Sequence, residues 1–226
     1  MRKIAVIGLG RFGMELARQL GASPAQVIAI DNSRPLVEEI KDHVDAAVRL
    51  DSTDEAALVA HEIDKVDVCV VAIGENFEAA LLTTVIVKKL GCPRVICRAQ
   101  TAFHAEIFRR IGADEVIQPE AQAGETLARR LGSPHLEDFI PLAEGFTLIE
   151  MHVPAKFRGK ALRDLQLRNK YGINLVAIKR PLPPGPDGAP RQFAVISVPD
   201  PDDVIFPDDL LVVVGSNEAL AKLPRE

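Results

Sequence analysis

The sequence predicts an α/β fold, a Rossmann-like doubly wound parallel sheet followed by a small α+β domain, and two observations predict it. From Arg2 to about Ile117, short runs rich in β-branched residues alternate with longer amphipathic stretches, which is the pattern of successive β-α-β units. Beyond residue 146 this alternation gives way to strands with only short helical pieces between them. The first half therefore builds the parallel sheet, and the second half forms a separate, smaller domain.

The first half divides into predicted strands and helices in strict alternation. The predicted strands are Lys3–Ile7, Val27–Ile30, Ala46–Leu50, Val66–Ala72, Arg94–Arg98 and Glu115–Gln118. The predicted helices are Arg11–Leu20, Arg34–His43, Asp54–Ile63, Phe77–Leu90, Ala102–Ile111 and Glu120–Leu131. Several of these helices are followed by glycine, a residue that ends helices because it accepts a left-handed backbone.

The alternation stops at Ser133-Pro134, since proline disfavours a helical residue before it. We expect a first domain over residues 1–133, a hinge or linker over residues 134–145, and a second domain over residues 146–226. The second domain's predicted elements are strands Phe146–Val153, Ile173–Arg180, Phe193–Val198 and Asp209–Gly215 and helices Ala161–Leu167 and Asn217–Leu223. The proline-rich segment Pro181–Pro190 predicts an exposed hairpin loop, because proline cannot donate to a strand ladder.

Composition favours a soluble globular protein. Among the 226 residues, 27 basic and 32 acidic side chains give a net charge of −5. This charge disfavours nucleic acid as a partner, because it repels a phosphate backbone. No apolar run approaches the roughly 20 residues that cross a bilayer, and no signal-peptide pattern precedes the first strand. We therefore expect a cytosolic protein.

Three cysteines, Cys69, Cys92 and Cys97, form no C-x-x-C pair. An odd number without that spacing disfavours both a disulfide framework and a zinc site. Cys69 lies in a strand-like run, where a free cysteine serves as a small hydrophobic residue.

A glycine-rich motif, Gly8-Leu9-Gly10-Arg11-Phe12-Gly13, connects the first predicted strand to the first predicted helix. Glycine permits a tight turn and close approach of the backbone, and a helix N-terminus offers unpaired N–H groups and a positive dipole end to phosphate. Asp31 ends the second strand eighteen positions after Gly13, near the spacing at which a carboxylate accepts hydrogen bonds from a ribose. Together these features predict a site for an adenosine phosphate.

The motif also carries a cation. The helix dipole and N–H groups suffice for a pyrophosphate, so the guanidinium of Arg11 favours a ligand with additional phosphate charge. The alternative is an arginine that points to solvent.

Two further groups of residues follow predicted strands and so lie at the carboxyl edge of the sheet, where ligands bind. Asp51-Ser52-Thr53 follows the third strand, and Asp51 is a candidate for the adenine amino group. Ser52 or Thr53 capping the next helix is the alternative interpretation. Ala72-Ile73-Gly74 follows the fourth strand, and its small residues leave room for the ribose or the phosphates.

Several stretches of this sequence resemble one known family. They are AVIGLGRFG from Ala5, AIG from Ala72, RAQ from Arg98, IGADEVIQPE from Ile111 and LRNKYGINLVAIK from Leu167. They are similar to the RCK or KTN group, the cytosolic regulatory subunits of bacterial Ktr/Trk-type potassium uptake systems. The resemblance covers nearly the whole chain and extends well beyond the glycine motif.

The resemblance implies a soluble gating ring, typically an octamer built from dimers, docked on a membrane-embedded potassium-translocating subunit at the inner face of the cell membrane. ATP and ADP are expected to hold this ring in different shapes. The resemblance places Arg11 at the terminal phosphate and Asp31 at the ribose. It places Glu120 near the phosphates at a dimer interface, where a divalent cation such as Mg²⁺ can bind. The alternative interpretation is that Glu120 only complements the positive end of the helix dipole.

The resulting nucleotide site comprises Gly8, Gly10, Arg11, Phe12, Gly13, Asp31, Asn32, Asp51, Ser52, Thr53, Ala72, Ile73, Gly74, Arg98 and Glu120. The second half resembles a small α+β ligand-binding domain that binds cyclic di-AMP between two protomers. The resemblance places Arg168 at a phosphate, Asn174 at a polar contact, and Leu162, Leu167 and Pro199 against adenine. Arg163 departs from the family pattern, because relatives commonly carry an apolar residue there.

Three alternatives share the glycine motif. An NAD-dependent oxidoreductase needs an acid–base group, yet the histidines are scattered and none pairs with a nucleophile or carboxylate in a motif: His43, His61, His104, His135 and His152. We therefore predict that the chain is not an enzyme, and we expect His152 to be packed in an apolar strand.

A Trk-type regulator that binds NAD(H) instead of ATP is the nearer alternative, and Arg11 and Glu120 favour ATP. A DNA-binding repressor is disfavoured by the negative charge and by the lack of a helix-turn-helix segment.

Overall fold

The computed structural model describes residues 1–132, 136–183 and 192–224 and divides the chain into two compact units. The first unit comprises Met1–Ala123 and the second comprises Gly124–Glu226. The expected domain boundary at residue 133 therefore differs from the observed division, which falls within a helix. Each unit is described by itself.

The first unit contains a parallel six-stranded sheet in the order β3-β2-β1-β4-β5-β6. The strands are β1 (Lys3–Ile7), β2 (Gln26–Asp31), β3 (Ala46–Arg49), β4 (Val68–Val71), β5 (Val95–Arg98) and β6 (Glu115–Ile117). The strand order reverses between β1 and β4, which are hydrogen-bonded neighbours. In open α/β sheets such a reversal opens a crevice at the carboxyl ends of the strands. The sequence prediction of a doubly wound Rossmann-like sheet is confirmed.

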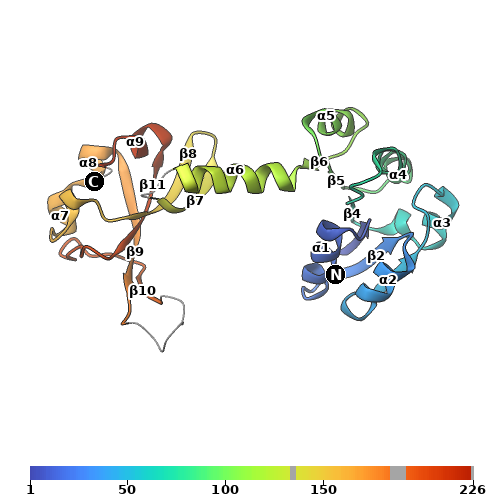
Figure 1. The fold of residues 1–226 in the computed structure, drawn as a ribbon, viewed down its shortest axis with the longest axis horizontal. Coiled ribbons are helices and arrows are strands. Elements are labelled where there is room, and N and C mark those ends of the chain that lie inside the picture. Colours follow the sequence, from blue (N-terminus) through green and yellow to red (C-terminus); the bar gives the residue numbers. More distant parts are fainter. Residues whose placement is uncertain (133–135, 184–191, 225–226) are drawn as a thin grey trace. The chain divides into compact units, whose positions relative to one another are not determined.

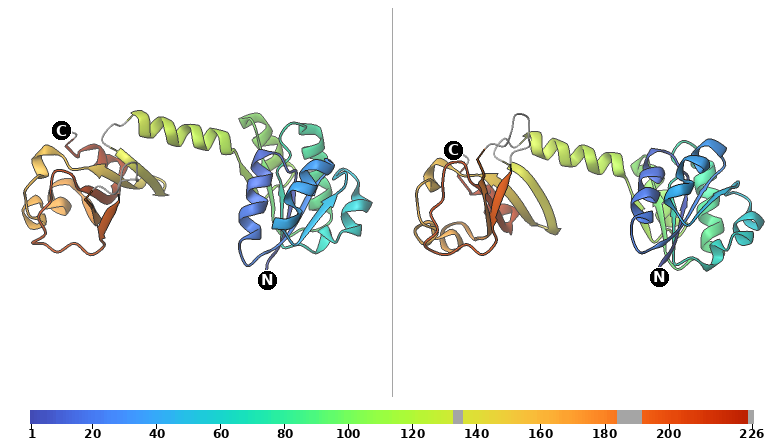
Figure 2. Two further views of the ribbon diagram at one scale, coloured as in Figure 1. Left: turned by 60° about the horizontal axis from the view of Figure 1, so that its bottom comes forward. Right: turned by 90° about the horizontal axis from the view of Figure 1, so that it is seen from below.

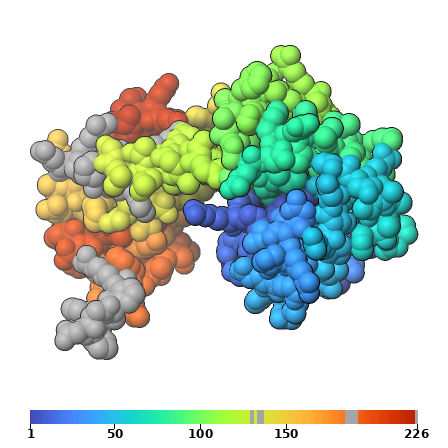
Figure 3. Space-filling model, turned by 45° about the vertical axis from the view of Figure 1, so that its right-hand side comes forward, coloured from blue at the N-terminus to red at the C-terminus, as the bar shows by residue number. Residues whose placement is uncertain are grey.

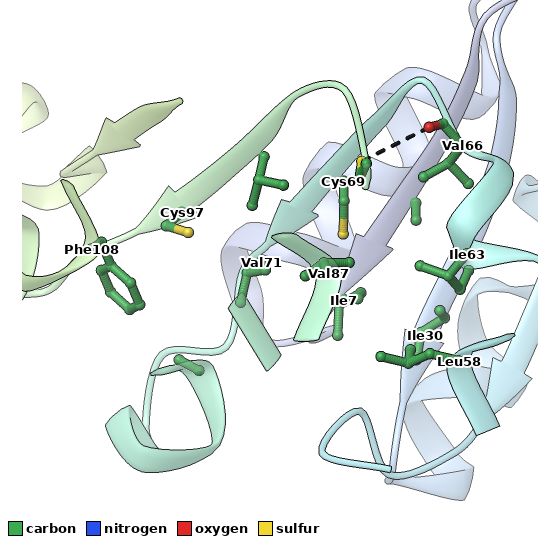
Figure 4. Close-up of a cluster of buried hydrophobic side chains, with 14 of the residues drawn as sticks. Ile7, Ile30, Leu58, Ile63, Val66, Cys69, Val71, Val87, Cys97 and Phe108 are labelled. Atoms are coloured by element: carbon green, nitrogen blue, oxygen red, sulfur yellow. Dashed lines mark hydrogen bonds between the residues drawn. The ribbon is translucent and has the colours of Figure 1, made fainter. Parts of the chain in front are cut away.

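Helices cover both faces of this sheet (Figures 1 and 2). They are α1 (Arg11–Gly21), α2 (Arg34–Ile40), α3 (Glu55–Ala60), α4 (Phe77–Lys89) and α5 (Ala102–Arg110), with 3-10 turns at Lys41–His43 and Ile63–Lys65. Met14, Ala17 and Val37 from α1 and α2 pack on one face. Side chains of α3, α4 and α5 pack on the other, where Figure 4 shows Leu58, Val87 and Phe108 beside the strand residues. Helix α6 (Pro119–Gly132) follows β6 and continues past the division between the units.

The second unit contains a five-stranded antiparallel sheet in the order β10-β9-β11-β8-β7. Its strands are β7 (Leu136–Ala143), β8 (Phe146–His152), β9 (Ile173–Pro181), β10 (Phe193–Ile196) and β11 (Leu210–Ser216). Short helices α7 (Leu162–Leu165), α8 (Leu167–Tyr171) and α9 (Asn217–Ala221) and the 3-10 turn Ala155–Phe157 contribute to its core. The expected small α+β domain is therefore present.

Three expectations for this half need correction or comment. The stretch 134–145, expected as a hinge, contains β7, which pairs with β8 from Leu136 to Ala143. Residues 133–135 and 184–191, which hold the proline break and most of the expected hairpin loop, lie outside the described residues. His152 is exposed rather than packed, and its Nε2 lies 2.9 Å from Glu137 Oε1.

Among the residues that the structure describes, we find no helix whose length and apolar character would let it cross a bilayer.

Candidate functional site

A cavity of about 640 Å³ opens at the carboxyl edge of the parallel sheet, at the reversal between β1 and β4. Its walls come from the loops after β1, β2, β3, β4 and β5 and from the start of α6. The predicted site residues that line it are Gly8, Gly10, Arg11, Phe12, Asp31, Asn32, Asp51, Ser52, Ile73, Gly74, Arg98 and Glu120. The sheet topology thus gathers residues that are far apart in the sequence around one space.

The glycine motif shapes the floor of this cavity. Gly8 has φ +96°, a left-handed conformation that favours glycine, and a Cβ there would lie 2.7 Å from the backbone N of Ile73. A Cβ at Gly13 would collide with the carbonyl oxygen of Gly8. Gly13 does not line the cavity, and its function is to let α1 approach the loop after β1.

Asp31 at the end of β2 is fixed by two backbone groups. Its Oδ2 accepts a hydrogen bond from Leu9 N at 2.7 Å, and its Oδ1 accepts one from Ser33 N at 2.8 Å. Each carboxylate oxygen has a second lone pair, so the carboxylate keeps capacity to accept hydrogen bonds from a ligand's hydroxyl groups. The residue predicted for the ribose is therefore held in position by the glycine loop itself.

The N-terminus of α1 is left without a side-chain cap. By contrast α3, α4 and α5 are preceded by the N-cap residues Asp54, Asn76 and Thr101, whose side chains accept hydrogen bonds from the first-turn N–H groups. The N-cap residue of α1 is Gly10, and the first turn of α1 has no acidic residue. Its first-turn N–H groups and positive dipole end are therefore available to an anion in the cavity.

Arg11 lines the same cavity and is exposed. Within the described residues no ion pair or hydrogen bond of its guanidinium is found. A guanidinium at an uncapped helix N-terminus adds positive charge where the dipole is already positive, which favours an anionic ligand.

The group after β3 corrects one prediction. Neither Ser52 nor Thr53 caps the next helix, because Asp54 does so through Ala56 N and Ala57 N. Buried Ser52 instead shares a hydrogen bond with Thr83 on α4, with 2.8 Å between the two hydroxyl oxygens. Thr53 does not line the cavity.

Asp51, the candidate for the adenine amino group, does line it. Its Oδ1 accepts hydrogen bonds from the backbone N and the hydroxyl of Thr53, and these bonds lower the pKa of Asp51 below its ordinary value. Asp51 is therefore a carboxylate acceptor that faces the cavity.

An arginine–glutamate pair also lines the cavity. The guanidinium of Arg98, at the end of β5, donates to Glu120 Oε1 in the first turn of α6. This bond lowers the pKa of Glu120 below its ordinary value. Ala72, the remaining predicted residue, is buried beneath Gly13 and does not line the cavity.

A second cavity, of about 400 Å³, lies within the second unit. Leu162, Leu167, Arg168 and Pro199 line it as expected. Asn174 does not line it, but its Oδ1 accepts a hydrogen bond from Arg168 Nε at 2.5 Å.

The residue that departs from the family pattern also lines the second cavity. Arg163 stands at its edge and forms an ion pair with Asp202, both side chains being exposed. The lining of this cavity therefore includes two cationic side chains, those of Arg163 and Arg168, and the apolar residues Ile173 and Leu175.

Comparison with known proteins identifies the family. The TrkA-N domain matches residues 4–119, and the TrkA-C domain matches residues 146–226. The Ktr system potassium uptake protein C of Bacillus subtilis (strain 168) is 37% identical over 224 residues, which are 99% of this chain and 96% of that protein. The Ktr system potassium uptake protein A of Vibrio alginolyticus is 33% identical over 220 residues, covering 97% and 95% of the two chains. The chain belongs to the TrkA-type family of potassium uptake proteins.

Solved structures agree with this TrkA-type fold. The GsuK channel aligns with 97% of the chain at a TM-score of 0.64 and 18% identity. The GsuK channel bound to NAD aligns with 98% at a TM-score of 0.53 and 24% identity. The chain spans less than half the length of these GsuK chains, namely 38% and 37%. The resemblance to the RCK group drawn from the sequence is confirmed, and the solved structures show the shared fold.

The cavity of this TrkA-type protein has lining residues that the sequence prediction missed. They are Ile7, Ile30, Ser33, Leu36, Leu50, Glu75, Asn76, Ala79 and Gln100. Most of them end a strand or lie within a few residues beyond one, so a wider window at each strand end would have found them. Leu36 and Ala79 lie on helices and carry no such signal.

A resident metal has little support from the protein alone. Among the described residues no three histidine, cysteine, aspartate or glutamate side chains gather as a metal site. Glu120 can offer one carboxylate, so a divalent cation there would need most of its ligands from elsewhere.

Proposed function

We propose that this chain is a cytosolic nucleotide-sensing regulatory subunit of a potassium uptake system, in which ATP and ADP favour different shapes of a regulatory ring. The observation that carries the proposal is the cavity at the carboxyl edge of the sheet, which is lined by Arg11 and lies at the N-terminus of α1, a helix start without a side-chain cap. The relatives that match nearly the whole chain are Ktr system potassium uptake proteins, which supports the choice of system.

The cavity suits an adenine nucleotide. Asp31 accepts ribose hydroxyls, Asp51 accepts from the adenine amino group, and the N–H groups of α1 bind the first phosphates. Arg11 then binds the terminal phosphate through charge-assisted hydrogen bonds. A ligand shifts a conformational equilibrium only through different affinities for the two shapes, so the phosphate that ADP lacks must make such a contact. Arg11 and Glu120 are our candidates for it.

The substitution Arg11→Ala tests this proposal. We expect it to weaken ATP binding by about 10- to 100-fold, the cost of losing charge-assisted hydrogen bonds, and to change ADP binding by less than about threefold. Isothermal titration with ATP and ADP measures both affinities. Arg34→Ala is the matched control, because Arg34 begins α2 as Arg11 begins α1 but does not line the cavity. Equal losses for ATP and ADP would remove Arg11 from the discrimination.

An NAD(H)-binding regulator is the alternative, since the same glycine motif binds dinucleotides. Titration with NADH beside ATP separates the two, and tighter NADH binding would replace ATP in the proposal. The protein is proposed to sense its ligand without consuming it, so turnover of an organic metabolite with NAD would instead favour an oxidoreductase.

A divalent cation such as Mg²⁺ fits this site only together with the nucleotide. Glu120 would supply one oxygen and the phosphates would supply others, because the described residues contain no set of three ligands. Its chemistry would be to neutralise phosphate charge beside Glu120.

The proposal includes assembly with further copies and with a membrane-embedded potassium-translocating subunit, at the inner face of the cell membrane. Leu82 and Val85 on α4 are each 46% exposed, and Phe103 on α5 is 72% exposed. The two helices lie beside each other on the surface of the first unit, in turquoise to green in Figure 3. Exposed apolar side chains on neighbouring helices support a homo-oligomer, proposed as dimers within an octameric ring.

Cyclic di-AMP is proposed as a second ligand, at the cavity of the second unit. Arg168 would bind a phosphate, and Leu162, Leu167 and Pro199 would pack against adenine. We expect Arg168→Ala to weaken cyclic di-AMP binding at least about tenfold and to leave ATP binding unchanged. Equilibrium dialysis measures both ligands. Lys170→Ala on the same helix is the control, because Lys170 does not line the cavity, and unaltered dinucleotide binding in Arg168→Ala would contradict the assignment.

A further inference from the structure

Arg98 is a nearly buried cation with unused hydrogen-bond donors. Its side chain is 14% exposed, and among the described residues its Nε is buried without a hydrogen-bond partner. A guanidinium has five N–H donors, and Glu120 Oε1 accepts from one of its terminal nitrogens. A buried cation with unmet donors favours any acceptor that reaches it, and Arg98 lines the nucleotide cavity.

Three other elements hold the guanidinium in this place. A Cβ at Gly74 would collide with a terminal nitrogen of Arg98, so glycine after β4 leaves open the space that the guanidinium occupies here. The ring of Phe12, at the start of α1, has its centroid 6.0 Å from Arg98 Cζ. Glu120 contributes from the first turn of α6. The position of Arg98 is therefore built by β4, α1 and α6 together, at the wall that the phosphates of a ligand on α1 would face.

Two anions then compete for one cation. The Glu120 carboxylate and a ligand's phosphates both seek the donors of Arg98, and they repel each other. Arg98 has donors for both anions, so the competition is electrostatic: phosphate that reaches Arg98 repels the Glu120 carboxylate and thereby weakens its bond to Arg98. Glu120 lies in the first turn of α6, the helix that continues past Ala123 into the second unit, so this bond is the point where the cavity contacts that helix.

We propose that the guanidinium of Arg98 is shared between Glu120 and the phosphates of the bound nucleotide, so that nucleotide binding loosens the first turn of α6. The proposal rests on the proposed nucleotide binding and goes beyond it by naming the contact through which binding reaches α6. This proposal and the proposed cation site assign Glu120 opposite effects on nucleotide binding. Without a divalent cation, Glu120 competes with the nucleotide instead of helping to bind it.

ATP affinity measured in EDTA tests the sharing. We expect Arg98→Gln to weaken binding about tenfold or more, because a charge-assisted contact is lost. We expect Glu120→Gln to strengthen binding about threefold or more, because Arg98 is released and a repelling carboxylate is removed. The gain from Glu120→Gln should shrink in the Arg98→Gln background, which a double-mutant cycle measures.

A second readout follows the helix itself. Hydrogen exchange of the α6 first-turn amides should speed up when ATP binds the wild-type protein in EDTA. In Arg98→Gln it should already be fast and should not respond to ATP, while Arg98→Lys should restore part of the response. Arg94→Gln is the matched control, since Arg94 precedes the same strand and pairs with Glu115 but does not line the cavity.

The outcomes separate the two proposals. A wild-type protein that binds neither ATP, ADP nor NADH would overturn both. ATP binding with an unchanged or weaker affinity in Glu120→Gln in EDTA would overturn the sharing alone. An equal gain from Glu120→Gln in both backgrounds would also overturn it, because simple repulsion without Arg98 would then explain the effect.

Discussion

Three free thiols lie in the core of the first unit, as small apolar side chains. Cys69 and Cys97 are fully buried, and Figure 4 shows both among the aliphatic side chains of the cluster. Burial raises the pKa of the Cys97 thiol to about 11, although the hydrogen-bonding contact with Thr84 opposes this rise. The sequence-based interpretation of Cys69 as a small hydrophobic residue is confirmed.

This raised pKa predicts an alkaline loss of stability. Between about pH 9 and 11 the unfolded chain ionises its thiol while folded Cys97 keeps its proton. The folded state then binds more protons, so the free energy of unfolding falls as pH rises, by about 1.4 kcal/mol per pH unit for this thiol. Urea unfolding at pH 8, 9 and 10 measures the slope. Cys97→Ala should make the slope shallower, and identical slopes in both proteins would contradict the role of Cys97.

Residue patterns predicted part of the candidate nucleotide site and missed the contacts between its residues. Gly8, Gly13 and Asp31 were predictable because their spacing along the chain alone dictates the turn and the acidic strand end. Arg98 and Glu120 were predicted one by one, but their bond joins residues twenty-two positions apart, and the guanidinium occupies space that the bare Cα of Gly74 leaves open. A contact that needs three elements to converge leaves no local pattern in the sequence.

At the scale of elements, the parallel sheet was predictable and the edge strand β7 was not. Strands buried on both faces appear as continuous apolar, β-branched runs, such as Val68–Val71, which is buried throughout. Helix starts carried a further signal, because Asp54, Asn76 and Thr101 each cap the helix that follows. Both features are local, so the order and type of elements in the first unit followed from the sequence.

Strand β7 was mistaken for a linker because the composition of an edge strand is less restricted than that of a central strand. It contains Pro141 and two acidic residues, Glu137 and Asp138, which resemble linker composition. Only one side of an edge strand pairs with a neighbour, so proline and charge are tolerated there. Phe139 packs against the core of the second unit, whereas Ile140 and Leu142 of the same strand are exposed, so apolar residues alone did not indicate which positions are buried.

At the scale of the whole molecule, the two units have separate cores. The clusters on the two faces of the parallel sheet belong to the first unit, and a third cluster, which includes Phe157 and Leu211, belongs to the second. Separate cores permit separate unfolding transitions. The chain has no tryptophan, and its one tyrosine, Tyr171, packs edge-on against Phe157. Tyrosine fluorescence therefore reports on the second unit alone, whereas circular dichroism reports on both.

The substitution Asp209→Ala tests this independence. Fully buried Asp209 accepts two hydrogen bonds of 3.0 Å from Arg180 and one of 2.9 Å from Phe206 N. Its removal takes the acceptor from Phe206 N and from the Arg180 guanidinium, which keeps only its bond to Val204 O among the described residues, and should destabilise the second unit by about 2 kcal/mol. The fluorescence transition should then shift to lower temperature, while ATP should raise only the remaining dichroism transition, because a ligand stabilises the unit that binds it. Asp208→Ala, at the exposed neighbouring position, should shift neither. A single transition that moves as one with both ATP and Asp209→Ala would show instead that the two cores unfold cooperatively.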